Sequence, residues 1–185
     1  MSESAFQILT QAIGYVGLVF SVIAFQCKKH KNVMRAKTAN EMFFALQYFL
    51  LGAYTGVAMN LVGSLRNMIF AKQVEKGKST LPMRVVFSAA FIVFGILTWQ
   101  SPMSLAVMLA KVVSTFAYGM KNTRAIRFLT LPTSACWLVY NYLSSSSAGV
   151  ICEAFTLLSI ITAIIRIELI EPWMKRRAEQ KNEKE

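Results

Sequence analysis

The sequence has no aspartate, one histidine and three cysteines among its 185 residues. Metal sites and covalent catalytic groups need His, Cys, Asp or Glu side chains gathered at characteristic spacings. His30 has no partner at such a spacing, and neither a G-x-S-x-G nor an H-E-x-x-H motif occurs. These absences argue against an enzyme, and we expect neither a cofactor nor a metal.

The cysteines Cys27, Cys136 and Cys152 form no C-x-x-C pair, and each lies in or beside an apolar stretch. Free cysteine in such a setting behaves as a small buried apolar residue. We therefore expect no disulfide framework.

Apolar residues make up 55% of the chain and charged residues only 16%, which is typical of a membrane protein. The net charge of +11 could indicate a nucleic-acid binder. However, the basic residues lie between apolar blocks and form neither one face nor one arm. Nucleic acid is therefore not an expected partner.

The chain contains seven apolar blocks, each a candidate transmembrane helix. The first follows a segment without basic residues, so we interpret it as a retained helix and not a signal peptide. The blocks are Ile8–Phe25, Met42–Ala53, Tyr54–Phe70, Val85–Trp99, Met103–Met120, Phe128–Tyr142 and Ala148–Leu169.

Basic residues between these blocks predict the orientation, because cytoplasmic loops are enriched in Lys and Arg. Seventeen lie in the segments 27–40, 72–84, 121–127 and 175–184, and the alternate loops carry none. Two successive cytoplasmic loops require an even number of crossings, so the stretch Met42–Phe70 must pass twice, turning near Gly52 to Gly56. The N-terminus is then outside and the C-terminus cytoplasmic, with the basic loops close to anionic lipid headgroups.

The block Met42–Ala53 is short for a crossing. We expect its helix to extend back into the preceding basic segment and to include Thr38.

An internal repeat relates the two halves of the sequence. An offset of 93 residues superposes eight residues, including Lys28 on Lys121, Gly56 on Gly149 and Leu65 on Leu158. The layout is three helices, one connecting helix and three helices again, and the odd connecting helix makes the halves parallel. The predicted fold is an all-α polytopic membrane protein with a first triple-helix bundle (6–72), a connecting helix (84–100), a second bundle (101–169) and a basic cytoplasmic tail (170–185).

This layout resembles the SWEET, semiSWEET and PQ-loop superfamily, and over nearly the whole chain the sequence resembles the bacterial inner-membrane family YgjV. The superfamily resemblance implies movement of sugars or other small solutes by rocking of two triple-helix bundles, and some members act as cargo receptors. The Pro-Gln pair of that superfamily is replaced here by Phe25-Gln26 and Tyr118-Gly119. Of the prolines that act as hinges in sugar-carrying relatives, Pro132 is present and Ala39 stands at its repeat partner.

Polar side chains inside apolar blocks are costly, and they mark candidate sites. Asn60 lies on a stripe with Gly56, Gly63, Ser64 and Asn67, and the repeat places Glu153 at the equivalent position. By position, Asn60 and Glu153 resemble the substrate-contacting asparagines of sugar-transporting relatives. The alternative is that small and amide side chains only let helices pack closely.

The second and sixth helices carry a matching face, since Phe44 and Gln47 align with Trp137 and Tyr140 at the same offset. An aromatic ring beside amide and hydroxyl groups suits a sugar ring. An aromatic belt at the membrane interface is the alternative, and it fits Tyr140 better than Trp137.

Lys111 lies near the middle of the fifth helix, at a depth similar to that of Glu153. Because either charge alone would be costly inside a bundle, we predict an ion pair between them, either structural or coupled to substrate or protons. Arg66 lies one to two turns from the cytoplasmic end, and we expect it to snorkel as an anchor, with an anionic substrate contact as the alternative.

The sequence thus predicts a transporter of a small polar solute, sugar or sugar-like, that works by alternating access. Its predicted substrate-binding residues are Asn60, Glu153, Phe44, Trp137, Gln47, Tyr140 and Lys111. A non-transporting membrane receptor or regulatory protein on the same scaffold is the alternative, motivated by the altered Pro-Gln pairs. A homo-oligomer is compatible with either function.

Overall fold

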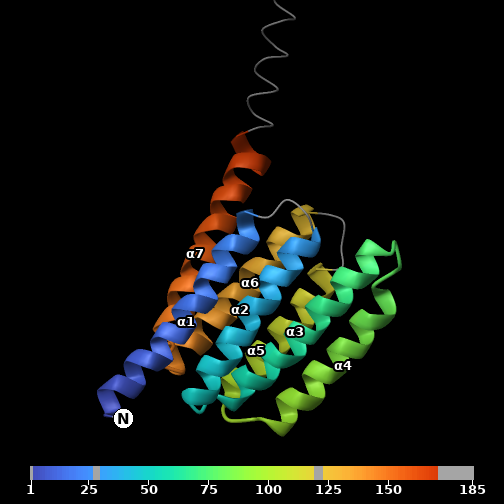
Figure 1. Cartoon of the computed structure of the whole chain (residues 1–185). Coiled ribbons are helices and arrows are strands. Elements are labelled where there is room, and N and C mark those ends of the chain that lie inside the picture. Colours follow the sequence, from blue (N-terminus) through green and yellow to red (C-terminus); the bar gives the residue numbers. More distant parts are fainter. Residues whose placement is uncertain (1, 27–29, 119–122, 171–185) are drawn as a thin grey trace, which may run out of the picture.

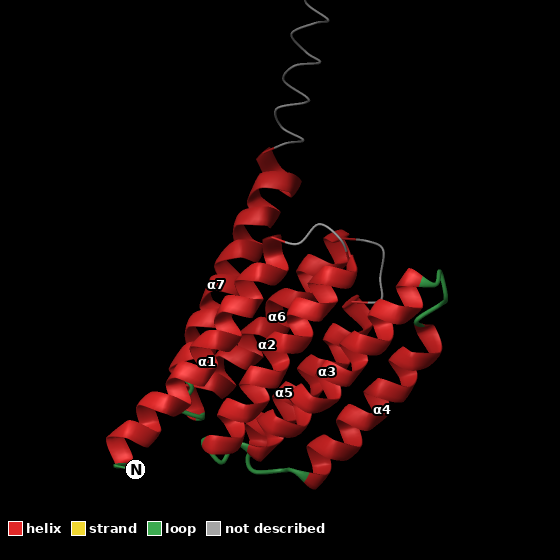
Figure 2. Cartoon of the chain, viewed as in Figure 1, coloured by secondary structure: helices red, strands yellow, loops and turns green. Residues whose placement is uncertain are grey.

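The structure is a computed structural model that describes residues 2–26, 30–118 and 123–170. Over these residues it contains seven α-helices, a short π-helical segment and no strand (Figure 2). The elements are α1 (Glu3–Gln26), α2 (His30–Leu50), α3 (Tyr54–Glu75), α4 (Leu81–Leu97), α5 (Pro102–Tyr118), α6 (Thr123–Leu143), α7 (Ser147–Ile164) and the π-helical continuation Ile165–Ile170. The predicted all-helical class is confirmed.

The 29-residue apolar stretch Met42–Phe70 divides into two helices, as the charge pattern predicts. The turn between α2 and α3 contains Gly52 with φ of +70°, a left-handed conformation that glycine adopts without steric cost. Successive helices then run in opposite directions (Figure 1).

Helix α2 begins at His30, twelve residues before the apolar block at Met42. Thr38 lies within it and donates a hydrogen bond from Oγ1 to the Met34 carbonyl at 2.8 Å, so the predicted extension is confirmed. The extension also places Glu41 in the interior of a helix, where sequence analysis had assigned no role to it.

Packing follows chain order: α2 lies against α1 and α3, and α6 lies against α5 and α7. The two groups meet where α7 packs on α1 and where α3 packs on α5, and α4 packs on both α3 and α5. Six helices therefore form a closed ring, with α4 beside it (Figure 1). Pro132 lies inside α6.

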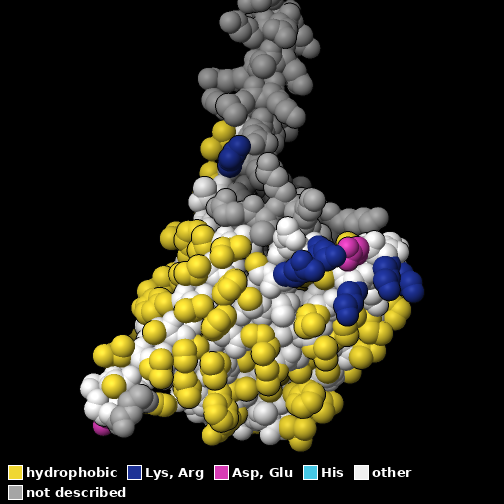
Figure 3. All heavy atoms as spheres, viewed as in Figure 1, with side chains coloured by type: hydrophobic (Ala, Val, Ile, Leu, Met, Phe, Trp, Pro, Cys, Tyr) yellow, Lys and Arg dark blue, Asp and Glu magenta, His cyan; other side chains and the backbone are white. Residues whose placement is uncertain are grey.

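The lateral surface is apolar, with large exposed side chains such as Ile8, Leu97 and Leu158 (Figure 3). Contiguous apolar surface of this kind marks a face that contacts a membrane or another protein. Among the described residues, one segment, Glu3–Ala24, has both the length and the hydropathy of a membrane span, and three shorter apolar helices are Leu81–Leu97, Pro102–Tyr118 and Ser147–Thr162.

Lys and Arg side chains gather toward one end of the molecule (Figure 3). Near that end Lys31 Nζ lies 2.6 Å from Glu75 Oε1, joining α2 to α3 through an exposed ion pair. The hydrogen bond from Lys31 lowers the pKa of the Glu75 carboxyl.

Candidate functional site

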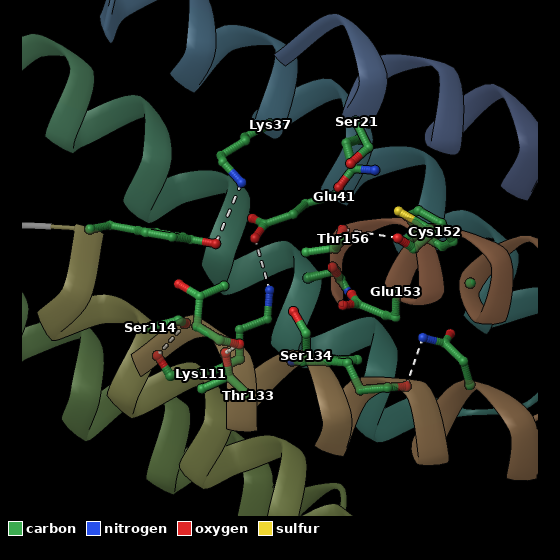
Figure 4. A pocket seen from close by; sticks show the side chains of 18 of the residues that line it. Ser21, Lys37, Glu41, Lys111, Ser114, Thr133, Ser134, Cys152, Glu153 and Thr156 are labelled. Atoms are coloured by element: carbon green, nitrogen blue, oxygen red, sulfur yellow. Dashed lines mark hydrogen bonds and ion pairs between the residues drawn. The ribbon is translucent and has the colours of Figure 1, made fainter. Parts of the chain in front are cut away.

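A cavity of about 450 Å³ lies inside the helix ring. Its walls come from α1, α2, α3, α5, α6 and α7, and along α2 they extend from Val33 to Tyr48. Volumes of 300–1,000 Å³ are typical of small-molecule sites. The wall is lined in part by hydroxyl, amide and charged side chains (Figure 4).

Glu41 is the centre of the charged part of the wall. Its Oε1 accepts a hydrogen bond from Lys111 Nζ at 2.8 Å and one from Arg66 Nη2 at 3.3 Å. Its Oε2 accepts one from Asn67 Nδ2 at 3.1 Å. One carboxylate from α2 thus binds a cation from α3 and another from α5.

Arg66 is fully buried, with an exposed fraction of 0%, so the prediction that it snorkels to the cytoplasmic surface is wrong. Its guanidinium donates to Glu41, to Asn67 and to Thr115, the last at 2.9 Å. It also lies 5.0 Å from the centre of the Tyr118 ring. Burial is possible because the charge and its N–H groups are satisfied inside the bundle.

Lys111 does not pair with Glu153, so that prediction is also wrong: its partner is Glu41. The Lys111 ammonium lies 5.1 Å from the centre of the Trp137 ring. An ammonium has three donors, and the described residues accept one hydrogen bond from Lys111, through Glu41.

Glu153, on α7, lines the cavity and is partly accessible from it. Its carboxylate lies beside Ser134 of α6 (Figure 4). None of the ion pairs among the described residues includes Glu153. The cavity therefore contains one carboxylate held by two cations and a second one that has no ion-pair partner in the part of the chain that the structure describes.

The aromatic side chains that line the cavity are more enclosed than a ring on which a sugar could stack. Trp137 is 9% exposed, with the Lys111 ammonium over its ring. Tyr48 stacks on the same ring at 6.3 Å and Tyr140 meets it edge-on at 5.5 Å. Little of either face of the indole is left for a solute.

A layer of hydrogen bonds, which we call the closing layer, lies next to the cavity at the end formed by the α2–α3 and α6–α7 turns. Tyr48 donates from its hydroxyl to Asn141 Oδ1, and the Gly56 amide donates to the Tyr140 hydroxyl at 2.7 Å. Gln47 Oε1 accepts from Ser146 Oγ at 2.9 Å. Because Tyr48 and Asn141 are 93 positions apart, this bond joins residues that the internal repeat relates.

The structure separates the seven predicted site residues into two groups. Gln47 and Tyr140 belong to the closing layer and are buried in it, so Tyr140 is not part of an interfacial belt. The other five line the cavity: Asn60, Glu153, Phe44, Trp137 and Lys111.

Glu41 is the site residue that sequence analysis missed. Its signal was present, since an acidic residue stands one position before an apolar block in an otherwise basic segment. Had the whole segment from His30 been treated as helix, Glu41 would have fallen at the depth of Lys111 and Arg66.

The described residues contain no group of three or more His, Cys or Glu side chains placed to hold a metal ion. Cys152 is buried and Cys136 is half-buried, whereas Cys27 falls outside the described residues. The arrangement is suited to binding a polar solute reversibly through hydrogen bonds and ionic contacts.

Comparison with known proteins gives the family. A family model described as a bacterial inner membrane protein, Imp-YgjV, matches residues 8–170. Inner membrane protein YgjV of Escherichia coli strain K12 is 23% identical over 163 residues, which cover 85% of this chain and 84% of that protein. No solved structure matches. The chain therefore belongs to the YgjV family of bacterial inner membrane proteins.

Proposed function

We propose that the protein is a multi-pass inner-membrane transporter of a small polar solute. The cavity is the observation that carries this proposal. About 450 Å³ of space, lined in part by charged and hydrogen-bonding side chains, lies among helices whose outer surface is apolar. Charged side chains in the interior of a membrane protein are costly, and they commonly mark a substrate or ion pathway.

The proposed architecture is two parallel triple-helix bundles, α1–α3 and α5–α7, joined by α4. The packing supports this division, because each group is continuous and the groups meet at two junctions, α3 with α5 and α7 with α1. The bond between the repeat-related residues Tyr48 and Asn141 also supports it. This plan and the repeat are the basis for proposing a relationship to the SWEET and PQ-loop superfamily.

The proposed orientation puts the N-terminus in the periplasm and the C-terminus in the cytoplasm. The side-chain distribution supports it, since the basic residues gather toward one end (Figure 3). Such a bias sets membrane topology.

The position of the cavity between the two groups of helices supports a mechanism of alternating access. The closing layer separates the cavity from the proposed periplasmic side through contacts made largely across the groups, such as Gln47 with Ser146. Rocking of one group against the other would break these contacts and open that side.

Uptake into proteoliposomes tests the proposal, with a panel of neutral sugars, amino sugars and sugar acids against protein-free liposomes. We expect saturable uptake of at least one member. A receptor on the same scaffold is the competing function, favoured by the substituted Pro-Gln pairs. Specific binding of a peptide or protein, with no flux of any solute, would support the receptor and contradict the transporter.

A further inference from the structure

The two carboxylates of the described cavity wall have different surroundings. Glu41 accepts hydrogen bonds from Lys111 at 2.8 Å and from Arg66 at 3.3 Å. Glu153 is half-buried on α7, and within the described residues it belongs to no ion pair. A carboxylate away from water and without a cation is costly, and a proton commonly removes its charge. Glu153 is therefore the carboxyl group in this cavity that is suited to bind a proton.

The cations around Glu41 do not depend on a charge at Glu153. Two cations, Arg66 and Lys111, face the one carboxylate of Glu41, and aromatic ring faces stabilise the remaining positive charge. The Lys111 ammonium lies 5.1 Å from the ring centre of Trp137, and the Arg66 guanidinium lies 5.0 Å from that of Tyr118 and 5.5 Å from that of Phe91. Glu153 can therefore be ionised or neutral while this cluster keeps its own contacts.

The surroundings of Glu153 suit both states. The ionisable groups that interact with it electrostatically are Lys37, Lys111, Tyr48 and Cys152. Helices α1 and α6 pack against α7, and the side chains that they add to the described cavity wall are not titratable: Ser21, Thr130, Thr133, Ser134, Trp137 and Asn141. The Ser134 hydroxyl lies beside the carboxyl group, and a hydroxyl can donate to a carboxylate or accept from a carboxylic acid.

A bound solute can take the place of the proton. Ser114, Thr133 and Thr156 each donate their hydroxyl proton to a carbonyl of their own helix, at 2.8–3.0 Å. Their oxygens remain as acceptors in the cavity wall, and ionised Glu153 is a stronger acceptor than these hydroxyls. A solute with hydroxyl donors would satisfy the Glu153 carboxylate, as a proton does. The solute and the proton therefore compete for the same carboxyl group.

We infer that Glu153 is the proton-binding site of a carrier that exchanges protons for its solute. This inference rests on the proposed transport function and specifies what drives it. The solute displaces the proton from Glu153 when it binds, and a proton returns to the carboxylate when the solute leaves. The solute and the proton therefore cross the membrane in opposite directions. Where the periplasm is more acidic than the cytoplasm, this exchange moves the solute out of the cell.

Infrared difference spectroscopy of the purified protein tests the proton site without any solute. A protonated carboxylic acid has a carbonyl stretching band that a carboxylate lacks. We expect such a band to grow as the pH is lowered into the mildly acidic range, where exposed carboxyl groups remain ionised. Glu153→Gln should remove the band, and Glu75→Gln, which removes an exposed carboxylate from an ion pair, should keep it. An identical band in Glu153→Gln, or no band in the unaltered protein, would overturn the inference.

A pH gradient across proteoliposomes tests the exchange. The probe is the member of the sugar, amino-sugar and sugar-acid panel that shows saturable uptake, and protein-free liposomes under the same gradient correct for passive movement. With an acidic lumen and a neutral medium, we expect the solute to accumulate above its outside concentration. The reversed gradient should oppose uptake. Equal uptake under both gradients, or accumulation driven by an acidic medium, would overturn the inference.

Glu153→Gln shows whether this side chain is responsible, because glutamine has nearly the same shape and cannot exchange a proton. Accumulation under the gradient is compared with exchange of labelled for unlabelled solute at equal concentrations and equal pH. A weaker affinity for the solute would lower both, whereas we expect accumulation to be lost and exchange to remain measurable. Accumulation in the same proportion to exchange as in the unaltered protein would overturn the inference. If the variant does not fold, the two gradients applied to the unaltered protein still decide the question.

The infrared and transport assays separate this inference from the transporter proposal. Uptake that does not respond to the pH gradient would overturn the exchange and leave transport standing. A titrating band from Glu153 without flux of any solute would overturn transport and leave the proton site standing.

Discussion

Glu41 accepts hydrogen bonds from Lys111 and Arg66 through one oxygen and from Asn67 through the other. Its carboxylate neutralises one of two adjacent buried cations. Removing one member of a buried ionic cluster leaves charge without compensation, and this costs about 3–5 kcal/mol. Glu41 therefore has the largest expected effect of any single charged side chain in the cavity.

At this scale we predict that Glu41→Gln lowers the free energy of unfolding by about 3–5 kcal/mol, because Arg66 and Lys111 then face each other without a carboxylate. Lys111→Met should cost less, since Glu41 keeps Arg66 as a partner. Thermal unfolding of the purified protein in detergent measures both effects.

Glu75→Gln is the matched control, because it removes a carboxylate from an exposed ion pair. It should leave the unfolding temperature nearly unchanged. A Glu41→Gln protein as stable as this control would show that the charged cluster contributes nothing to the fold.

Helices α6 and α7 approach each other closely beside the closing layer, where Gly149 of α7 lies against the Asn141 side chain of α6. A methyl group at this position would overlap Asn141 and displace the acceptor of the Tyr48 hydrogen bond. Helix propensity alone favours alanine over glycine by about 1 kcal/mol. Close packing against Gly149 therefore disfavours alanine there, although helix propensity favours it.

We predict that Gly149→Ala destabilises the protein by about 1–3 kcal/mol, as overpacking in a close contact does. Gly77→Asn is the control: Gly77 has φ of +63° with open space beside it, and asparagine tolerates this conformation. Unfolding temperatures compare the two variants. An unchanged or higher value for Gly149→Ala would mean that the closing layer adapts without cost.

Much at the level of elements could be predicted from the sequence. Runs of apolar residues predicted the helices, and the positions of the basic segments correctly predicted that Met42–Phe70 divides into two helices. Pairing between side chains could not be predicted in the same way. The partner of Lys111 depends on how α2 and α5 face each other, and this is decided by packing and not by position along the chain.

The role of Glu41 could not be predicted either, because it depends on where helix α2 begins. Composition marked the segment 27–40 as a basic loop, yet α2 begins at His30, because a polar segment can continue a helix whose apolar part is packed. The depth of a residue near such a boundary therefore depends on tertiary structure.

For the molecule as a whole, the distribution of basic residues predicts a periplasmic N-terminus and a cytoplasmic C-terminus. Fusions to the C-terminus test this directly: green fluorescent protein should fluoresce and alkaline phosphatase should be inactive, because the first folds in the cytoplasm and the second needs the periplasm. An active phosphatase fusion together with a non-fluorescent fusion would show that the C-terminus is periplasmic. The closing layer would then lie on the cytoplasmic side.

The central claim is that the cavity carries a polar solute across the membrane by alternating access. Counterflow tests it most directly: proteoliposomes are loaded with one unlabelled solute of the panel above, and the entry of a trace of the same solute in labelled form is followed. A carrier that exposes one site to each side in turn predicts transient accumulation above the equilibrium level, absent from protein-free liposomes. Entry that only approaches equilibrium at the rate of protein-free liposomes, for every member of the solute panel, would contradict the claim.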